Sequence, residues 1–367
     1  DAKFRDRVLM PFATTFIVLQ VGMSAVFAWS LWKDRRFPRV LEVGTLALLG
    51  SLPFTYWAAL LPFRSWGNPA YFAFTFGGGL ALALVAHRLF RHPLGAPSVL
   101  LGAMLATPMV SVVFLGSRLQ LSTVFGDSPI VAGRFAGINN VTFAQVMVAA
   151  IVLAVFLRHQ MPGGRSQVWI AALLGLVLVV DVAPMWGADV GGILAGVPGL
   201  LLTFWLLAGR RVRARHLAVW GVAAFVVLVA LGGRDLVRDP SQRTHLGRLL
   251  ERIGADGFTG LRTVVDRKRE AMVTSLAESV WRFMAVPALV TVGYLIWRAP
   301  GQLRGLRQRM PDLDAGLVGM AAVGVLGFAL NDSGIAVPGA MLGVVVPAAI
   351  YLAVRLGREP VTEGEAP

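Results

Sequence analysis

The sequence predicts an all-α membrane protein, a polytopic bundle of about eleven helices that cross a bilayer. Hydrophobic residues make up 56% of the 367 residues and charged residues only 15%. The mean hydropathy of +0.69 is above what a soluble core requires. Apolar runs of about 17 to 24 residues recur along the chain, each long enough to cross about 30 Å of hydrocarbon. Because hydrocarbon offers no partner to a bare peptide group, and because the runs do not alternate, we expect helices and not a barrel.

The predicted spans follow one another with mostly short connections between them. Their expected limits are residues 8–32, 41–62, 70–90, 97–116, 138–157, 167–183, 191–208, 216–233, 280–297, 314–330 and 336–354. The connection 234–279 differs, since its apolar residues recur at helical spacing with polar residues between them, as in Leu246, Leu249 and Ile253. That pattern predicts amphipathic helices that lie on the outer membrane surface. We therefore expect residues 1–367 to form a single transmembrane domain with one surface segment.

The distribution of basic residues predicts the orientation, because short cytoplasmic loops are rich in Lys and Arg. One set of alternate loops, together with the C-terminal tail, holds eighteen Lys and Arg residues. The other short loops hold three, or six when the N-terminal Lys3, Arg5 and Arg7 are added. We therefore expect the N-terminus outside and the C-terminus in the cytoplasm, which agrees with an odd number of spans.

Composition also excludes several classes of function. The net charge of +14 does not indicate nucleic acid as a partner, since the basic residues lie at span ends and form no basic domain with interleaved aromatic residues. The absence of cysteine excludes disulfides, thiolate chemistry and cysteine-ligated metals. The chain starts at Asp1 without the layout of a signal peptide, which indicates a fragment or a processed form. The partner that the apolar spans do indicate is the lipid bilayer.

With this orientation, the unusual polar residues fall on the outer side. The stretch 179–192, VVDVAPMWGADVGG, places two aspartates between two apolar runs. Asp189 directly precedes the expected start of a helix and is predicted to be its N-cap. Asp181 is harder to explain as a turn residue, because it lies in the last turn of the preceding run and a charge near hydrocarbon is costly. The nearby glycines permit close approach of a helix or of a ligand.

Three other outer connections carry polar residues that have two interpretations each. In the stretch 125–140, FGDSPIVAGRFAGINN, the arginine could bind an anionic oxygen or pair with the nearby aspartate. The basic residues of RDPSQRTHLGR could bind a substrate or contact lipid phosphates. The acid of LNDSG could be functional or could belong to a capping turn.

Together, these four connections predict a binding site at the outer face for an anionic or sugar-phosphate headgroup. Its aspartates are candidate ligands of a divalent cation. The sequence assigns no catalytic residue and no metal-binding set. The residues expected to bind substrate are Asp127, Arg134, Asn139, Asn140, Asp181, Asp189, Arg243, His245, Arg248, Asn331 and Asp332.

The segments GDSPIVAGRFAGINN, GADVGG, DPSQRTHLGR and LNDSGIAVPGAM resemble the membrane region of a group of multi-span bacterial envelope proteins that is frequent in actinobacteria. The resemblance extends from about Val8 to Arg355. In that group, an outward domain of the alkaline-phosphatase superfamily precedes the spans, which implies an outside N-terminus and a task in the cell envelope. That hydrolase domain is absent from this chain, so none of its catalytic residues can be transferred.

These patterns favour a bacterial inner-membrane protein that binds or processes an anionic or lipid-linked envelope substrate at the outer leaflet. Whether it is an enzyme stays open. A transporter or flippase is the main alternative, because Gly- and Pro-rich span ends also occur at transport sites. Acids or arginines at both faces of the bundle would favour transport. A membrane anchor for a hydrolase domain is the second alternative, although one or two spans suffice for an anchor.

Overall fold

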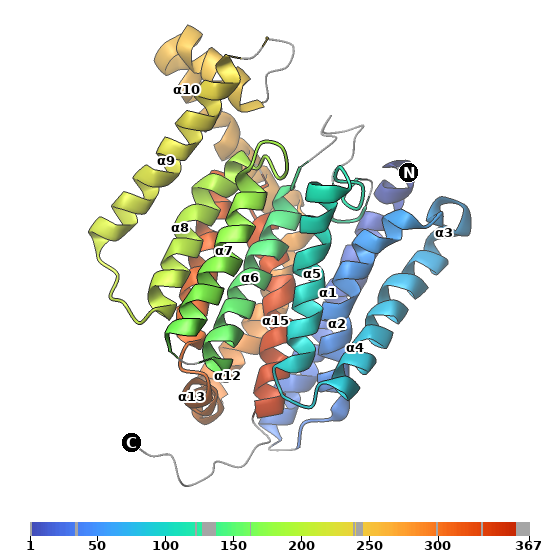
Figure 1. Ribbon diagram of the computed structural model, residues 1–367. Helices are drawn as coiled ribbons and strands as arrows, with labels where there is room; N and C mark the ends of the chain where they lie inside the picture. The colour runs from blue at the N-terminus through green and yellow to red at the C-terminus, as the bar shows by residue number, and fades with distance from the viewer. Residues whose placement is uncertain are drawn as a thin grey trace.

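Helices run back and forth between two ends of the molecule in the computed structural model (Figure 1). The structure describes residues 2–33, 36–121, 123–126, 137–161, 163–237, 239, 245–298, 300–331 and 333–356. None of these residues forms a strand. Helix α1 (Ala2–Trp32) begins at the end drawn at the top of Figure 1, and α15 (Ala336–Leu356) finishes at the opposite end. We call these the upper end and the lower end.

Ten helical segments in the described ranges are long and apolar enough to cross a bilayer. They are α1, α2 (Arg39–Trp57) with the 3-10 turn Ala58–Leu60, α3 (Phe63–Phe72) continuing into α4 (Gly78–Leu89), α5 (Gly95–Phe114), α6 (Asn140–Gln160), α7 (Gly164–Val182), α9 (Ala214–Leu236), the segment Val280–Trp297, α14 (Leu313–Leu330) and α15. The apolar part of α8 (Val190–Leu207) is shorter, spanning Gly191–Leu207. The predicted all-α, multi-pass membrane fold is confirmed, and each predicted apolar run lies on a helix.

Two of these segments contain π-helical turns. In the first, η2 (Ala73–Gly77) lies between α3 and α4. The second consists of η4 (Val280–Met284), α11 (Ala285–Ala288), η5 (Leu289–Gly293) and α12 (Tyr294–Arg298), with η5 as the π-helical turn. Single π-turns inside helices are often found at functional sites.

Two helices lie at the ends of the bundle. At the upper end, α10 (His245–Glu278) bends at Gly257, whose φ of 54° interrupts the helix. Its Lys268 donates a hydrogen bond from Nζ to the carbonyl of Leu330 at 2.7 Å, which ties α10 to the end of α14. At the lower end, α13 (Pro300–Arg309) precedes α14. The sequence did not predict α13 as a helix, because this short Arg-rich segment carries only two leucines at helical spacing, Leu303 and Leu306.

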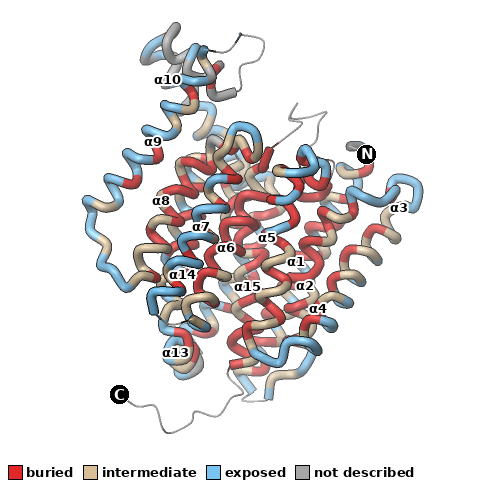
Figure 2. Tube along the Cα trace, in the orientation of Figure 1, coloured by how far each residue is buried: buried red, intermediate tan, exposed pale blue. Residues whose placement is uncertain are grey.

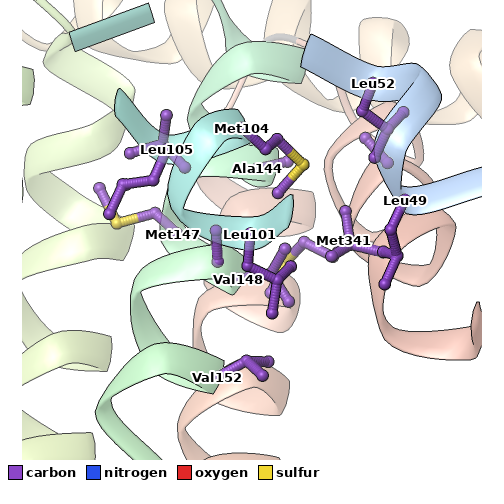
Figure 3. Packing of buried hydrophobic residues seen from close by; sticks show 14 of the residues in the cluster. Leu49, Leu52, Leu101, Met104, Leu105, Ala144, Met147, Val148, Val152 and Met341 are labelled. Atoms are coloured by element: carbon purple, nitrogen blue, oxygen red, sulfur yellow. The ribbon is translucent and has the colours of Figure 1, made fainter. Parts of the chain in front are cut away.

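Helices α6 and α15 form the centre of the bundle. In the most apolar 18-residue stretch of each, 78% is buried, compared with 17% in α9 (Figure 2). Side chains of α2, α5, α6 and α15 interdigitate there, with Met104, Met147 and Met341 among branched neighbours (Figure 3). Methionine fills irregular gaps between such side chains because its chain is unbranched. The large aliphatic core therefore lies between the two ends.

Small residues bring α8 close to α14. A Cβ added at Gly199 of α8 would overlap the side chain of Val323, and one added at Gly319 of α14 would overlap Thr203 Oγ1. Glycine at such positions allows two helix backbones to approach closely. This contact fixes the start of α8 next to the end of α14.

Candidate functional site

The turn between α7 and α8 folds back on the end of α7. The N–H of Gly187 donates to the carbonyl of Val180 at 2.9 Å, and the N–H of Asp189 donates to the carbonyl of Asp181 at 3.1 Å. The N–H of Ile138, just before α6, donates to the carbonyl of Gly187 at 2.8 Å. Backbone bonds therefore hold the two aspartates of this turn in fixed places.

Both aspartates are buried and meet at the start of α8. Asp181 is 0% exposed and Asp189 is 4% exposed. A Cβ added at Gly192 would overlap Asp181 Oδ2 and would lie 2.9 Å from Asp189 Oδ2. The glycine thus leaves room for two carboxylates near one point. The N–H groups at a helix start favour negative charge, which offsets part of the cost of placing the two acids there.

Asn331 reaches the same place from α14. It is the residue that follows the last turn of α14, and it is 5% exposed. Its Nδ2 lies 2.8 Å from the position of a Cβ added at Gly191, and Asp189 Oδ1 lies 3.5 Å from that position. This Nδ2 is buried and makes no hydrogen bond to any residue that the structure describes. Since buried amide groups normally have partners, the N–H is suited to an acceptor that enters the site.

We call Asp181, Asp189 and Asn331, together with Gly191 and Gly192, the upper cluster. It joins the end of α7, the start of α8 and the end of α14.

Asp189 occupies the N-cap position of α8, as predicted, but its side chain accepts no capping hydrogen bond. The predicted capping role of this carboxylate is therefore wrong. The backbone gives the reason, because ψ is 99° at Asp189 and 170° at Asn139, the N-cap of α6. Asn139 Oδ1 does accept from the N–H of Thr142, at 2.8 Å. The carboxylate of Asp189 lies beside the two glycines of the upper cluster instead.

The two asparagines at the start of α6 differ in their surroundings. Asn139 also donates from Nδ2 to the carbonyl of Phe125 at 2.6 Å, so both its polar groups are used in local structure. Asn140 donates from Nδ2 to Ser333 Oγ at 2.5 Å. The N–H of Ser333 donates to Asn331 Oδ1 at 3.4 Å. Asn140 is therefore linked to the upper cluster through one serine.

The other predicted site residues have no described side chains. Asp127, Arg134, Arg243 and Asp332 lie outside the described residues. The backbones of His245 and Arg248 belong to α10, but their side chains are outside the described part. Of the predicted residues, the structure thus brings together Asp181, Asp189 and Asn331 and links Asn140 to them.

Lys268 lies near the cluster, although sequence reasoning did not select it. Its bond to the carbonyl of Leu330 places an ammonium group one residue before Asn331. In the sequence it belongs to the run DRKRE, which is typical of a surface helix and does not indicate what the lysine contacts.

Sequence reasoning also missed a third buried carboxylate, which lies at the lower end. Glu42, in the first turn of α2, is 4% exposed. Its Oε2 lies 3.8 Å from Arg355 Nη1 of α15 and 4.0 Å from His87 Nε2 of α4. We call these three residues the lower cluster. A single acid at the start of an apolar run gives no sequence signal for a contact among three helices.

The upper cluster offers two carboxylates and one amide. Such groups accept hydrogen bonds from hydroxyl or ammonium groups, and carboxylates also bind divalent cations. Among the described residues, no three His, Cys, Asp or Glu side chains form a group that could hold a metal ion. A cation in this site would therefore take ligands from the amide oxygen or from its substrate.

The fold defines the chain as a multi-pass membrane protein. Comparison with known protein families, curated proteins and solved structures finds no match to it. The geometry of the two clusters is thus the basis for a functional proposal.

Proposed function

We propose that this chain is a bacterial inner-membrane protein with eleven spans, an outside N-terminus and a cytoplasmic C-terminus. The eleventh span is α8, which runs along the bundle (Figure 1) and packs against α14. An odd number of spans agrees with the opposite positions of the start of α1 and the finish of α15. The excess of Lys and Arg in the lower connections supports a cytoplasmic lower end. In this orientation the upper cluster belongs to the outer leaflet side.

The function that we propose is binding or processing of an anionic or lipid-linked envelope substrate at the outer leaflet. The observation that carries it is the convergence of Asp181, Asp189 and Asn331 at the start of α8. Burying each charge costs several kcal/mol. A turn can form without two buried carboxylates near one point, so a structural role alone does not explain them. Sugar hydroxyls would donate to the carboxylates, and a divalent cation would bridge them to a phosphate.

The sequence assigns the remaining candidate residues to the outer side of the membrane. In this proposal they complete the site around the headgroup of the substrate. They are Asp127, Arg134, Asn139, Asn140, Arg243, His245, Arg248 and Asp332. An outward hydrolase domain, if one precedes the chain, would lie on this side and could act on the bound substrate.

Asp181→Asn and Asp189→Asn are each expected to abolish stabilisation of the protein by a polyprenyl phosphate in the presence of Mg²⁺. The change removes a charge and keeps the shape of the side chain. Ligand at about a hundredfold above its Kd stabilises the folded state by about 2.7 kcal/mol, which raises the apparent Tm. Thermal unfolding of the purified full chain, with and without the lipid and Mg²⁺, measures this effect.

Asp314→Asn is the matched control for these variants. It also removes one aspartate charge, but Asp314 starts α14 at the lower end and its side chain is 55% exposed. It should respond to the lipid as the wild type does. A normal response from Asp181→Asn and Asp189→Asn would contradict a role for the upper cluster, and a wild type without any response would contradict the proposed substrate class.

A transporter or flippase is the second candidate, and the lower cluster favours it. Acids buried at both ends of the bundle are expected in a protein that exposes a binding site to each side in turn. A flippase would accelerate the exchange of fluorescent phosphatidylglycerol between the leaflets of reconstituted vesicles, and Glu42→Gln would slow that exchange. The outer-leaflet proposal instead predicts that the protein leaves the exchange rate equal to that of protein-free vesicles. Measurement of dithionite-accessible fluorescence over time decides between the two.

A further inference from the structure

A groove opens between α1 and α12, apart from both charged clusters. Its volume is about 410 Å³, and its lining residues are Ala28, Trp29, Trp32, Tyr294 and Trp297. The tryptophans are 45%, 61% and 72% exposed, in chain order. Aromatic rings thus form both walls of the groove, and Ala28 is its one small lining residue.

The geometry of the two helices explains why space is left here. Thr291 Oγ1, in the π-turn η5, donates to Ser24 Oγ of α1 at 3.0 Å, and both side chains are fully buried. This bond joins the two helices one turn before the groove begins. Beyond it, Ala28 has no bulk to fill the gap between the rings of α1 and α12. The groove therefore results from the way these two helices pack.

The groove is lined by aromatic rings and has a positive charge beside it. Lys33, the next residue after Trp32, is exposed and has its Nζ 4.3 Å from the centre of that ring. Arg36 follows in the connection to α2 and Arg39 begins α2, and both are exposed.

We propose that this groove binds one anionic phospholipid of the phosphatidylglycerol type. An acyl chain lies along the aromatic rings, and the phosphate lies beside Lys33. Tryptophan and tyrosine are typical of the membrane interface, where one side of the ring is apolar and its edge is polar. Basic side chains near the surface attract anionic headgroups.

A lipid fits this groove better than a second protein does. The groove lies on two apolar spans, so bilayer surrounds it, and the ammonium group of Lys33 beside Trp32 matches a phosphate. The inference is independent of the upper cluster. With the proposed topology, the lipid would belong to the cytoplasmic leaflet, and only this assignment depends on that topology.

The test is native mass spectrometry of the purified full chain, titrated with phosphatidylglycerol or with phosphatidylcholine of the same acyl chains. The wild type should bind phosphatidylglycerol more tightly. Lys33→Gln is expected to lower that affinity about fivefold, the contribution of one basic residue near a headgroup, and to leave phosphatidylcholine binding unchanged. Ala28→Phe is expected to lower binding of both lipids, because the added ring fills the groove.

Trp169→Ala serves as the matched control, since Trp169 is 59% exposed on α7, outside the groove. It should bind both lipids as the wild type does. Equal affinity of the wild type for the two lipids would overturn the assignment of an anionic headgroup. Unchanged binding in Ala28→Phe would overturn the groove as the site. A polyprenyl phosphate that displaces phosphatidylglycerol at lower concentration would show that the occupant is a lipid carrier, contrary to our proposal.

Discussion

A Gly79→Ala variant is expected to be less stable than the wild type by about 1 to 3 kcal/mol, the usual cost of adding a methylene group to a well-packed interior. Gly79, in α4, faces α2 at a point where the two backbones touch. A Cβ added there would lie 2.5 Å from the nitrogen of Ser51, 2.7 Å from its Cα and 2.8 Å from the carbonyl oxygen of Ala47. These are all backbone atoms, so no rotation of a side chain can relieve the overlap. The apparent Tm of the purified protein should fall by several degrees.

Gly77→Ala is the control for this prediction, because it adds the same methyl group two residues away. A Cβ added at Gly77 meets no atom within 4 Å. In a helix, alanine is more favourable than glycine by about 1 kcal/mol, so this variant should be at least as stable as the wild type. If both variants unfold at the same temperature, the close approach of α2 and α4 at Gly79 is not tight enough to matter.

The spans could be predicted from the sequence because each span carries its own signal. A run of about 20 apolar residues has to be a helix in hydrocarbon, whatever it packs against. The run 138–157 is an example, and from its third residue on it lies in α6 (Asn140–Gln160). Hydropathy does not indicate whether a helix lies at the centre or at the edge of the bundle. Helices α6 and α9 have similar mean hydropathy, 2.2 and 2.1, yet α6 lies at the centre and α9 at the edge.

The candidate site could be predicted only in part, for a similar reason. Composition and orientation indicated that Asp181, Asp189 and Asn331 belong to one end of the bundle. Their convergence depends on the packing of α8 against α14, which rests on glycines such as Gly199 and Gly319. Glycines of this kind are common in spans, and a sequence does not indicate which of them face each other.

Two errors follow from reading residue types one at a time. Asp189 has the right type and position for a helix cap, but with a ψ of 99° its side chain accepts no capping hydrogen bond. Glu42 has the ordinary appearance of an acid at a span end, yet it is buried between Arg355 and His87. In both cases the local sequence pattern does not indicate what surrounds the side chain.

Gly192→Ala is expected to abolish the response to polyprenyl phosphate and Mg²⁺ and to lower the stability by about 1 to 3 kcal/mol. The added methyl group would overlap Asp181 Oδ2 and would lie 2.9 Å from Asp189 Oδ2. Asp181 is fully buried, so its carboxylate cannot turn into solvent to avoid the clash. The two acids would have to move apart, and a substrate or cation that needs both would lose one of them. Thermal unfolding with and without the lipid measures both effects on one sample.

Gly196→Ala separates this explanation from a general effect of alanine in α8. Gly196 lies one turn further along the helix, and the nearest atom to an added Cβ is Met147 Cε at 3.2 Å, the mobile end of a flexible side chain. This variant should keep both the stability and the lipid response of the wild type. A Gly192→Ala protein that is destabilised but still responds to the lipid would mean that the buried aspartates support the turn and do not bind the substrate. Loss of the response in Gly192→Ala, with a normal response in Gly196→Ala, would instead place the headgroup at the start of α8.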